Sequence, residues 1–135
     1  MYKIIEKSML VPNIHSMTVE APDVARQVQA GQFVILMADE DGERIPLTVS
    51  DWDKTKGLIT VVFMNIGKTT GKLASLTPGK ELPVVVGPLG NPMEVAAFGT
   101  VLLIGGCYGI GSIYPIARAL KNLANFCRPR RTRSR

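Results

Sequence analysis

Residues 101–111 read VLLIGGCYGIG, and at this point the sequence changes character. The first four residues form an unbroken apolar run, which is typical of a strand buried on both faces of a parallel sheet. A glycine-rich turn follows at once, and residues 112–123 then carry apolar side chains at helical spacing. A strand, a glycine turn and a helix in this order open an α/β nucleotide-binding fold. We therefore expect the first β-α unit of such a lobe over residues 96–124.

The chain before residue 96 has the pattern of a β domain. Six segments are rich in Val, Ile, Thr and aromatic residues, and several of them alternate apolar with polar residues. Glycine, proline, asparagine and aspartate fall between them, and one short helix is predicted at residues 70–76. Six strands at this spacing predict a small antiparallel barrel or sandwich. The six segments are residues 2–11, 16–20, 33–37, 45–50, 58–64 and 82–86.

Composition and charge exclude several classes of protein. The 135 residues are 46% hydrophobic and 20% charged, which is usual for one compact domain and unlike a disordered or disulfide-rich chain. No apolar run approaches the ~20 residues that cross a bilayer, so no membrane partner is expected. The net charge of +5 lies entirely in the last eight residues, which contain five arginines, and residues 1–127 are neutral overall. No nucleic-acid partner is expected, because the strands also lack interleaved aromatic and basic residues.

The two ends of the chain carry further expectations. The N-terminal stretch MYKIIEKSML mixes charged with apolar residues, so no signal peptide is expected and the protein is expected to be cytoplasmic. Cys107 and Cys127 form no CxxC pair and are expected to be plain thiols in a reducing compartment. Residues 125–135 are expected to be a disordered basic tail without a second strand. Because one strand and one helix lack a sheet to join, either the chain is a truncated form of a longer protein or this unit packs on the barrel or on a partner.

Two clusters of chemically useful residues lie inside the predicted barrel. The first is residues 44–48, RIPLT, where an arginine can pair with a phosphate and a threonine hydroxyl can bond the edge of a heterocycle. A solvated arginine beside a strand is the alternative. The second is residues 65–71, NIGKTTG, where a helix N-terminus and its hydroxyls can hold an anion. Its alternative is a capped turn with Thr69 or Thr70 as the N-cap, and its spacing is not that of a P-loop.

Two glycine-rich clusters follow predicted strands. Residues 87–92, GPLGNP, would let the backbone lie against a flat ligand, or they form a rigid linker between domains. Residues 105–111 have the order GGxxGxG, which differs from the dinucleotide fingerprint GxGxxG. Neither cluster assigns a ligand by itself.

The clusters are more specific together than apart. The motifs RxPLT, GKTT and GPLGNP, followed by a strand leading to GGCYGIG and YPIARAL, resemble the ferredoxin-NADP reductase superfamily. The pattern is most similar to two of its branches, the flavin subunits of dihydroorotate dehydrogenase and the small subunits of NADH-dependent ferredoxin:NADP oxidoreductase, also known as sulfide dehydrogenase. The resemblance covers about residues 1–124. It implies a mainly β fold, with a six-stranded antiparallel Greek-key barrel of the FAD-binding type over residues 1–95, followed by the start of the α/β lobe.

The resemblance also implies which residues bind the cofactor. FAD would lie with its isoalloxazine along residues 46–48, with the Thr48 hydroxyl near the ring atoms that exchange hydride. Residues 62–64 would flank the flavin, the two threonines of the second cluster would lie in the loop that holds its pyrophosphate, and the glycine turn would support NAD(P)H. The flavin carries the chemistry, so no catalytic acid or base and no metal ligand is expected. The implied cofactor-binding residues are Arg44, Ile45, Pro46, Leu47, Thr48, Val62, Phe63, Met64, Gly67, Thr69, Thr70, Gly105, Gly106, Gly109 and Gly111.

The function implied by the resemblance is that of a FAD-binding oxidoreductase subunit that passes electrons between NAD(P)H and an iron–sulfur partner. A larger catalytic or iron–sulfur subunit and ferredoxin are the implied partners. The alternative is a truncated, inactive barrel that binds flavin without oxidising NAD(P)H. Two departures from the family pattern are present. Ile45 stands where many relatives have an arginine directly before the proline, and the chain lacks the four-cysteine motif for a [2Fe-2S] cluster.

Three isolated features have plain structural interpretations. His15 is the only histidine and has no carboxylate or serine spaced to form a triad, so it is expected at the surface. The acidic residues within 39–43 are expected in a solvated hairpin turn rather than as a catalytic acid and base. Trp52 and Tyr108 are aromatic residues able to stack on a ring, although core packing is expected for Trp52.

Overall fold

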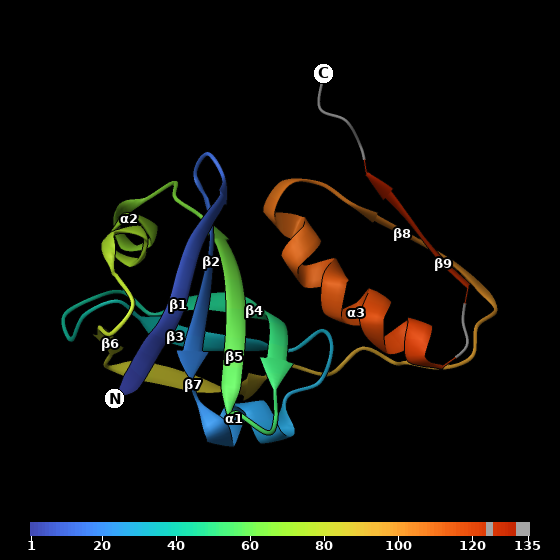
Figure 1. The fold of residues 1–135 in the computed structure, drawn as a ribbon, viewed down its shortest axis with the longest axis horizontal. Helices are drawn as coiled ribbons and strands as arrows, with labels where there is room; N and C mark the ends of the chain where they lie inside the picture. Colours follow the sequence, from blue (N-terminus) through green and yellow to red (C-terminus); the bar gives the residue numbers. More distant parts are fainter. Residues whose placement is uncertain (124–125, 132–135) are drawn as a thin grey trace.

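An antiparallel sheet of seven strands forms the first part of the molecule in the computed structural model, which describes residues 1–123 and 126–131. The strand order is β6-β1-β2-β5-β4-β3-β7, and every neighbouring pair is antiparallel. Figure 1 shows these strands wrapped into a barrel. The strands are β1 Tyr2–Val11, β2 Ile14–Glu20, β3 Phe33–Met37, β4 Ile45–Asp53, β5 Leu58–Met64, β6 Glu81–Leu82 and β7 Val84–Leu89.

The segment predicted as the sixth strand forms two strands, which pair with opposite edges of the sheet and so nearly close the barrel. The sequence predicts a single sixth strand at residues 82–86, but the structure divides this segment at Pro83 into β6 and β7. Proline has no N–H to donate to a ladder, so the chain changes its pairing there. β6 pairs with β1 and β7 pairs with β3, at opposite edges of the sheet. The prediction of six strands is therefore corrected to seven, and a single residue joins the two edge strands.

The barrel core consists of inward-facing side chains at alternating strand positions. On β5, Val61 and Phe63 are each 1% exposed, whereas their neighbours along the strand are half-buried. This alternation gives β5 an inner and an outer face. Helix α1, Pro22–Gln27, covers one end of the barrel with Val24 and Ala25 buried (Figure 1). The sequence does not predict α1, because six residues are too few to show a helical period.

A second, smaller unit follows the barrel. It contains strand β8 (Thr100–Gly105), the short 3-10 turn η1 (Cys107–Gly109), helix α3 (Ile110–Asn122) and strand β9 (Phe126–Arg131). Strands β8 and β9 pair in parallel, and α3 lies between this pair and the barrel (Figure 1). The predicted order of strand, glycine turn and helix is therefore present.

Two expectations for this unit are corrected. The sequence predicts no second strand, yet β9 supplies the backbone partner that β8 needs. The rest of the expected disordered tail, residue 125 and residues 132–135, lies outside the described residues. β8 is expected to be buried on both faces, but Leu102 is 57% exposed and Ile104 is 61% exposed. Helix α3 covers one face of β8, which leaves the side chains that point away from α3 exposed.

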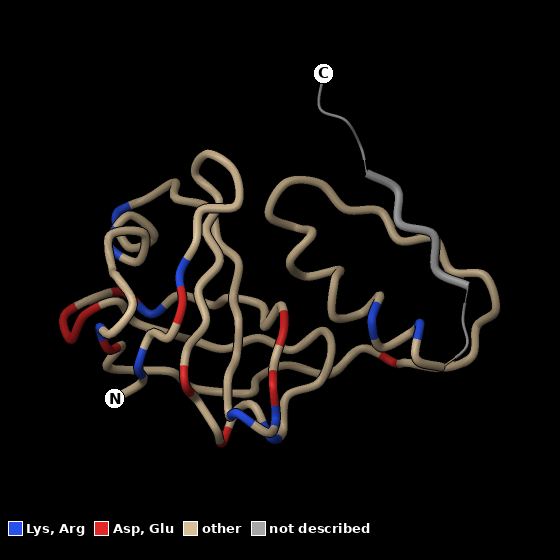
Figure 2. The backbone as a smooth tube through the Cα atoms, in the orientation of Figure 1, with Lys and Arg blue, Asp and Glu red and all other residues tan. Residues whose placement is uncertain are grey.

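The stretch that leads from the barrel into α3 is free of charged residues. Residues 95–117 contain no Lys, Arg, Asp or Glu. Figure 2 shows no charged position over β8, η1 and the first half of α3. The acidic residues within 39–43 lie in the turn between β3 and β4, where the sequence places them. In that turn, Asp39 forms an ion pair with Lys72 of helix α2 (Lys68–Ser75).

Candidate functional site

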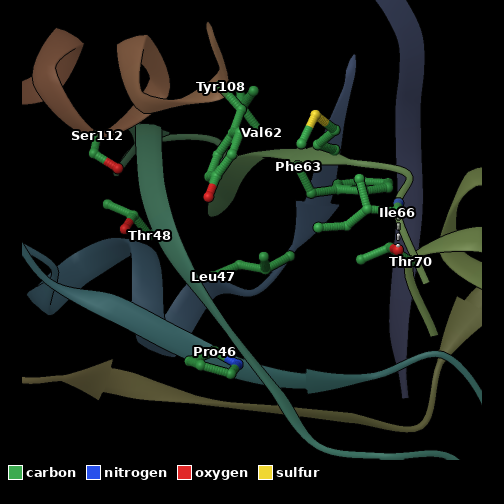
Figure 3. A pocket seen from close by; sticks show the side chains of 10 residues that line it. Pro46, Leu47, Thr48, Val62, Phe63, Ile66, Thr70, Tyr108 and Ser112 are labelled. Carbon is green, nitrogen blue, oxygen red and sulfur yellow. Dashed lines mark hydrogen bonds between the residues drawn. The ribbon is translucent and has the colours of Figure 1, made fainter. Parts of the chain in front are cut away.

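A pocket of about 240 Å³ opens on the outer face of strands β4 and β5, and we call it the β4–β5 pocket. The two strands supply six of its ten lining residues. The others come from the segment that leads into α2 and from the η1–α3 segment, which lie on different sides of the pocket in Figure 3. The lining residues are Pro46, Leu47, Thr48, Val62, Phe63, Met64, Ile66, Thr70, Tyr108 and Ser112.

Strand alternation brings the two predicted strand clusters into this pocket. On β4, Pro46 and Thr48 lie on the outer face, while Leu47 packs partly against the core. On β5, Val62 and Met64 lie on the outer face. All six strand residues that the resemblance assigns to the flavin and its flanking strand therefore line one pocket.

The start of helix α2 borders the same pocket. Its N-cap is Gly67, rather than Thr69 or Thr70 as the capped-turn interpretation expects. The Thr70 hydroxyl, at the third helical position, accepts hydrogen bonds from the backbone N–H groups of Gly67 at 2.9 Å and Ile66 at 3.1 Å. The Thr69 hydroxyl is buried and donates to the Glu43 carboxylate at 2.8 Å. Both predicted hydroxyls are thus bonded within the protein, and a carboxylate stands beside the helix start.

Gly111 is the point where helix α3 touches the barrel. It is buried, and a Cβ at this position would lie 2.8 Å from both the Ser50 Oγ and the Val62 Cβ. Only a residue without a side chain permits so close an approach. The structure therefore gives Gly111 a packing position between helix and barrel, away from the open side of the glycine turn.

The other predicted turn glycines differ in their surroundings. Gly105 ends β8 and packs against Ile113 of α3. Gly106 is exposed, and a Cβ on Gly109 would meet nothing within 4 Å. Of the four predicted glycines, Gly106 and Gly109 are thus the two that present open backbone to a ligand.

Several predicted residues lie outside the pocket. Arg44 is exposed just before β4, and Ile45 packs partly against the barrel core. Gly90, in the cluster at residues 87–92, has a φ of 81° and packs on Phe33, whose ring would lie 2.9 Å from an added Cβ. This cluster therefore contacts β3 through Gly90, and its position against a flat ligand stays a prediction.

A second contact holds α3 to the barrel near Trp52. Arg118 forms an ion pair with Asp51 of β4, and its guanidinium carbon lies 5.0 Å from the centroid of the Trp52 ring. The same carbon lies 5.8 Å from the centroid of the Tyr114 ring. Trp52 also packs partly against the core, as the sequence predicts. The arginine is therefore held by one carboxylate and two aromatic faces.

His15 is half-buried rather than at the surface. Its ring stacks on Phe63 with 5.5 Å between centroids, and its Nδ1 has no hydrogen-bond partner among the described residues. Desolvation by burial lowers the pKa of His15 from its ordinary value of 6.5, and the positive charge of Lys7 lowers it further. His15 is therefore neutral at pH 7 and packs behind the pocket, which corrects the expectation of a surface position.

Three lining residues are missing from the predicted cofactor-binding set. Tyr108 is among the aromatic residues that the sequence analysis marks as able to stack on a ring. Ser112 could have been found from the sequence, because it carries a hydroxyl directly after the glycine turn at the start of a helix. Ile66 lies between a strand end and a helix start and is 73% exposed. An exposed apolar residue in such a place indicates a contact with a ligand or a partner.

Within the described residues, His, Cys, Asp and Glu form no group of three that could hold a metal ion. In that same part of the chain, no helix is both long and apolar enough to cross a membrane. Cys107 is an exposed free thiol at the start of η1, with a φ of 53°.

Curated relatives match most of the chain, although no protein-family model matches it. A Thermotoga maritima protein named dihydroorotate dehydrogenase B (NAD(+)), electron transfer subunit homolog, is 42% identical over 123 residues, which are 91% of this chain and 44% of the relative. The dihydroorotate dehydrogenase B (NAD(+)) electron transfer subunit of Geobacillus thermodenitrificans is 30% identical over 125 residues, or 88% of this chain and 48% of the relative. The chain thus spans about half the length of the curated relatives it matches.

Solved structures also match most of the chain. The structure of an NADH-dependent reduced ferredoxin-NADP oxidoreductase matches with a TM-score of 0.95 and 40% identity, over 97% of this chain and 48% of that one. The chain belongs to the ferredoxin reductase superfamily. The fold of this superfamily also appears at 18% identity in the ferredoxin reductase of carbazole 1,9a-dioxygenase, with a TM-score of 0.84 over 96% of this chain and 41% of that one. The predicted superfamily is therefore confirmed.

Proposed function

We propose that the chain binds FAD in the β4–β5 pocket and passes electrons between NAD(P)H and an iron–sulfur partner subunit. The observation that carries this proposal is that two parts of the molecule meet at one pocket: the outer face of two barrel strands and the glycine turn that opens the α/β unit. The flavin would lie on the strands, and the nicotinamide dinucleotide would approach from the turn. The similar proteins are named electron transfer subunits and an NADH-dependent oxidoreductase, which supports this assignment.

The pocket suits a flat and mostly apolar ring with a polar edge. Val62 and Met64 offer apolar surface, and the Thr48 hydroxyl beside them can donate and accept hydrogen bonds. Its volume of about 240 Å³ is below the roughly 300–1,000 Å³ of sites that enclose a whole small-molecule ligand. We therefore assign the isoalloxazine alone to the pocket, and the rest of FAD would extend beyond it.

The start of α2 suits the pyrophosphate of FAD in one respect and opposes it in another. Lys68 is exposed at the first helical position, and a helix N-terminus favours anions. Glu43 bonds Thr69 at the same place and adds a negative charge. A pyrophosphate held at α2 would compete with Glu43 for the Thr69 hydroxyl.

FAD supplies the redox chemistry when it is bound, because it accepts electrons in pairs and releases them singly. The residues of the chain bind and orient it. The Thr48 hydroxyl can fix one edge of the ring, while Val62 and Met64 exclude water from its face. Among the described residues, those that line the pocket include no carboxylate, histidine or lysine.

In this proposal, the dinucleotide binds at the glycine turn. Gly106 is exposed and Gly109 has open space beside it, and backbone N–H groups at the start of a helix bind phosphates. Electrons would then leave the flavin for a larger catalytic or iron–sulfur subunit or for ferredoxin. The names of the relatives as subunits support a heteromeric partner.

The test is FAD binding by the purified chain and by two threonine variants. We expect a flavin absorption band that survives gel filtration. Thr48→Val should weaken FAD binding about threefold to tenfold, because a lost hydrogen bond costs about 0.5–1.5 kcal/mol. Thr55→Val is the matched control, since Thr55 lies exposed in the β4–β5 turn and does not line the pocket.

Titration followed by flavin fluorescence would measure the three affinities. Elution of all flavin in the small-molecule fraction would overturn the proposal. Equal FAD affinities of the two variants would instead remove Thr48 from the site.

A further inference from the structure

Tyr108 is an aromatic residue at the edge of the β4–β5 pocket. It is the central residue of η1 and is 48% exposed. Figure 3 shows its ring over the pocket, with the hydroxyl end directed inward toward Leu47 and Thr48. Phe63 is the other aromatic residue in the lining, but it is 1% exposed and stacks on His15. Tyr108 is therefore the lining residue that presents an open aromatic ring to a ligand.

The position of Tyr108 relative to the barrel is fixed by its neighbours. Gly111, three residues further on, packs α3 directly on β4 and β5, and Arg118 holds the same helix to β4 by an ion pair. Within the turn, the Gly109 N–H donates to the Gly106 carbonyl at 3.1 Å. The phenol ring is thus carried by a segment that is anchored on the barrel beyond it and closed by a hydrogen bond within it.

We infer that Tyr108 packs on the isoalloxazine of bound FAD and covers it on the side of the glycine turn. This inference rests on the proposed function and adds to it a contact residue that the sequence motifs do not assign. Two flat aromatic systems attract when they are offset-stacked or edge to face, and the Tyr108 ring already lies over the space that the isoalloxazine would fill. Tyr108 would shield the covered face of the flavin from solvent, and a nicotinamide that approaches from the turn would have to move this ring aside to reach the flavin.

The test is the fluorescence lifetime of bound FAD, which reports contact with a phenol. A tyrosine touching an excited flavin donates one electron and takes it back, which quenches the emission, whereas phenylalanine is too hard to oxidise to do so. We expect Tyr108→Phe to lengthen the lifetime several-fold while FAD affinity stays nearly unchanged. Tyr114→Phe is the matched control, because Tyr114 is 50% exposed on α3 and does not line the pocket. The fluorescence lifetime of FAD bound to Tyr114→Phe should equal that of FAD bound to the unaltered chain.

A second variant removes the ring entirely. Tyr108→Ala should lengthen the lifetime and also weaken FAD binding about tenfold, the loss that corresponds to one aromatic stacking contact. Thermal unfolding of all variants would show that the barrel remains folded. If FAD binds but its lifetime is the same in Tyr108→Phe, Tyr114→Phe and the unaltered chain, this inference is overturned while the proposed function stands. If the unaltered chain retains no FAD, both are overturned.

Discussion

At the scale of single residues, Glu43 bears directly on the proposed position of the FAD pyrophosphate. Its carboxylate accepts the Thr69 hydroxyl at 2.8 Å, and Thr69 is 8% exposed. Glu43 itself is exposed, so water and salt screen its charge without abolishing it. A pyrophosphate at the start of α2 would meet this negative charge and would have to displace it from Thr69.

Replacing Glu43 with glutamine is therefore expected to tighten FAD binding, by about twofold to fivefold at low salt, as for a single exposed charge. Glutamine keeps a carbonyl oxygen that can accept the Thr69 hydrogen bond, so the turn should be preserved. Glu40→Gln is the matched control, because it removes one exposed negative charge from the same β3–β4 turn. Titrations at low and high salt would measure both variants. If they bind FAD equally well, the pyrophosphate does not lie at α2.

The residues of the pocket were predictable to different degrees. The positions of residues 46–48 and 62–64 in one pocket could be predicted from sequence through the resemblance, because the order of the motifs matches that of the family. The contact of Glu43 with Thr69 could not, since it joins residues 26 positions apart through the folded barrel. Gly111 has two interpretations in a glycine-rich stretch, open backbone or close packing, and only the position of α3 against the barrel decides between them.

At the scale of elements, the docking of helix α3 controls the geometry of the pocket. Gly111 allows the N-terminal turn of α3 to touch β4 and β5, and Arg118 pairs with Asp51 and covers Trp52 further along the helix. Because Tyr108 lies just before this helix, a change in how α3 packs would move the ring relative to the pocket.

A pair of glycine variants tests this dependence. Gly111→Ala would place a methyl group 2.8 Å from the Ser50 Oγ and from the Val62 Cβ, so α3 must shift. We expect overpacking to destabilise the protein by about 1–3 kcal/mol and FAD binding to weaken. Gly109→Ala is the control, since its methyl group would meet nothing within 4 Å. Thermal unfolding and FAD titration would measure both, and equal effects would show that the close approach at Gly111 is unimportant.

Most helices and strands can be predicted from the local sequence pattern, except where contacts between distant parts of the chain determine their bounds or their burial. Most strands and α3 are visible in the sequence because their apolar periods are long enough to detect. The division at Pro83 depends on which strands the segment reaches in the barrel, and these are distant in sequence. The exposure of Leu102 and Ile104 could not be predicted, because an unbroken apolar run looks the same whether one face of the strand is covered or both are.

At the scale of the whole molecule, stability and the site are distributed differently. Every member of the barrel core cluster lies between Ile4 and Val85. Among the described residues, α3 adds Pro115 and Leu120 as buried side chains. Tyr108 and Ser112 nevertheless form part of the pocket lining, although both lie outside the barrel. The barrel should therefore fold by its own core, whereas the pocket needs both parts.

A polypeptide of residues 1–95 is expected to fold alone and to bind FAD more weakly than the 135-residue chain. Its core is intact, so heating should give a cooperative transition near that of the longer chain, measured by near-UV circular dichroism. FAD affinity should fall at least about tenfold, because the ~1.4 kcal/mol contact with Tyr108 is lost together with the contact with Ser112. Trp52, the only tryptophan, would lose Arg118 from above its ring, so its emission should shift to longer wavelength as an independent check. A transition without cooperativity would show that the barrel needs α3. Equal FAD affinity of the two polypeptides would show that the barrel alone completes the site, and it would count against the contact with Tyr108.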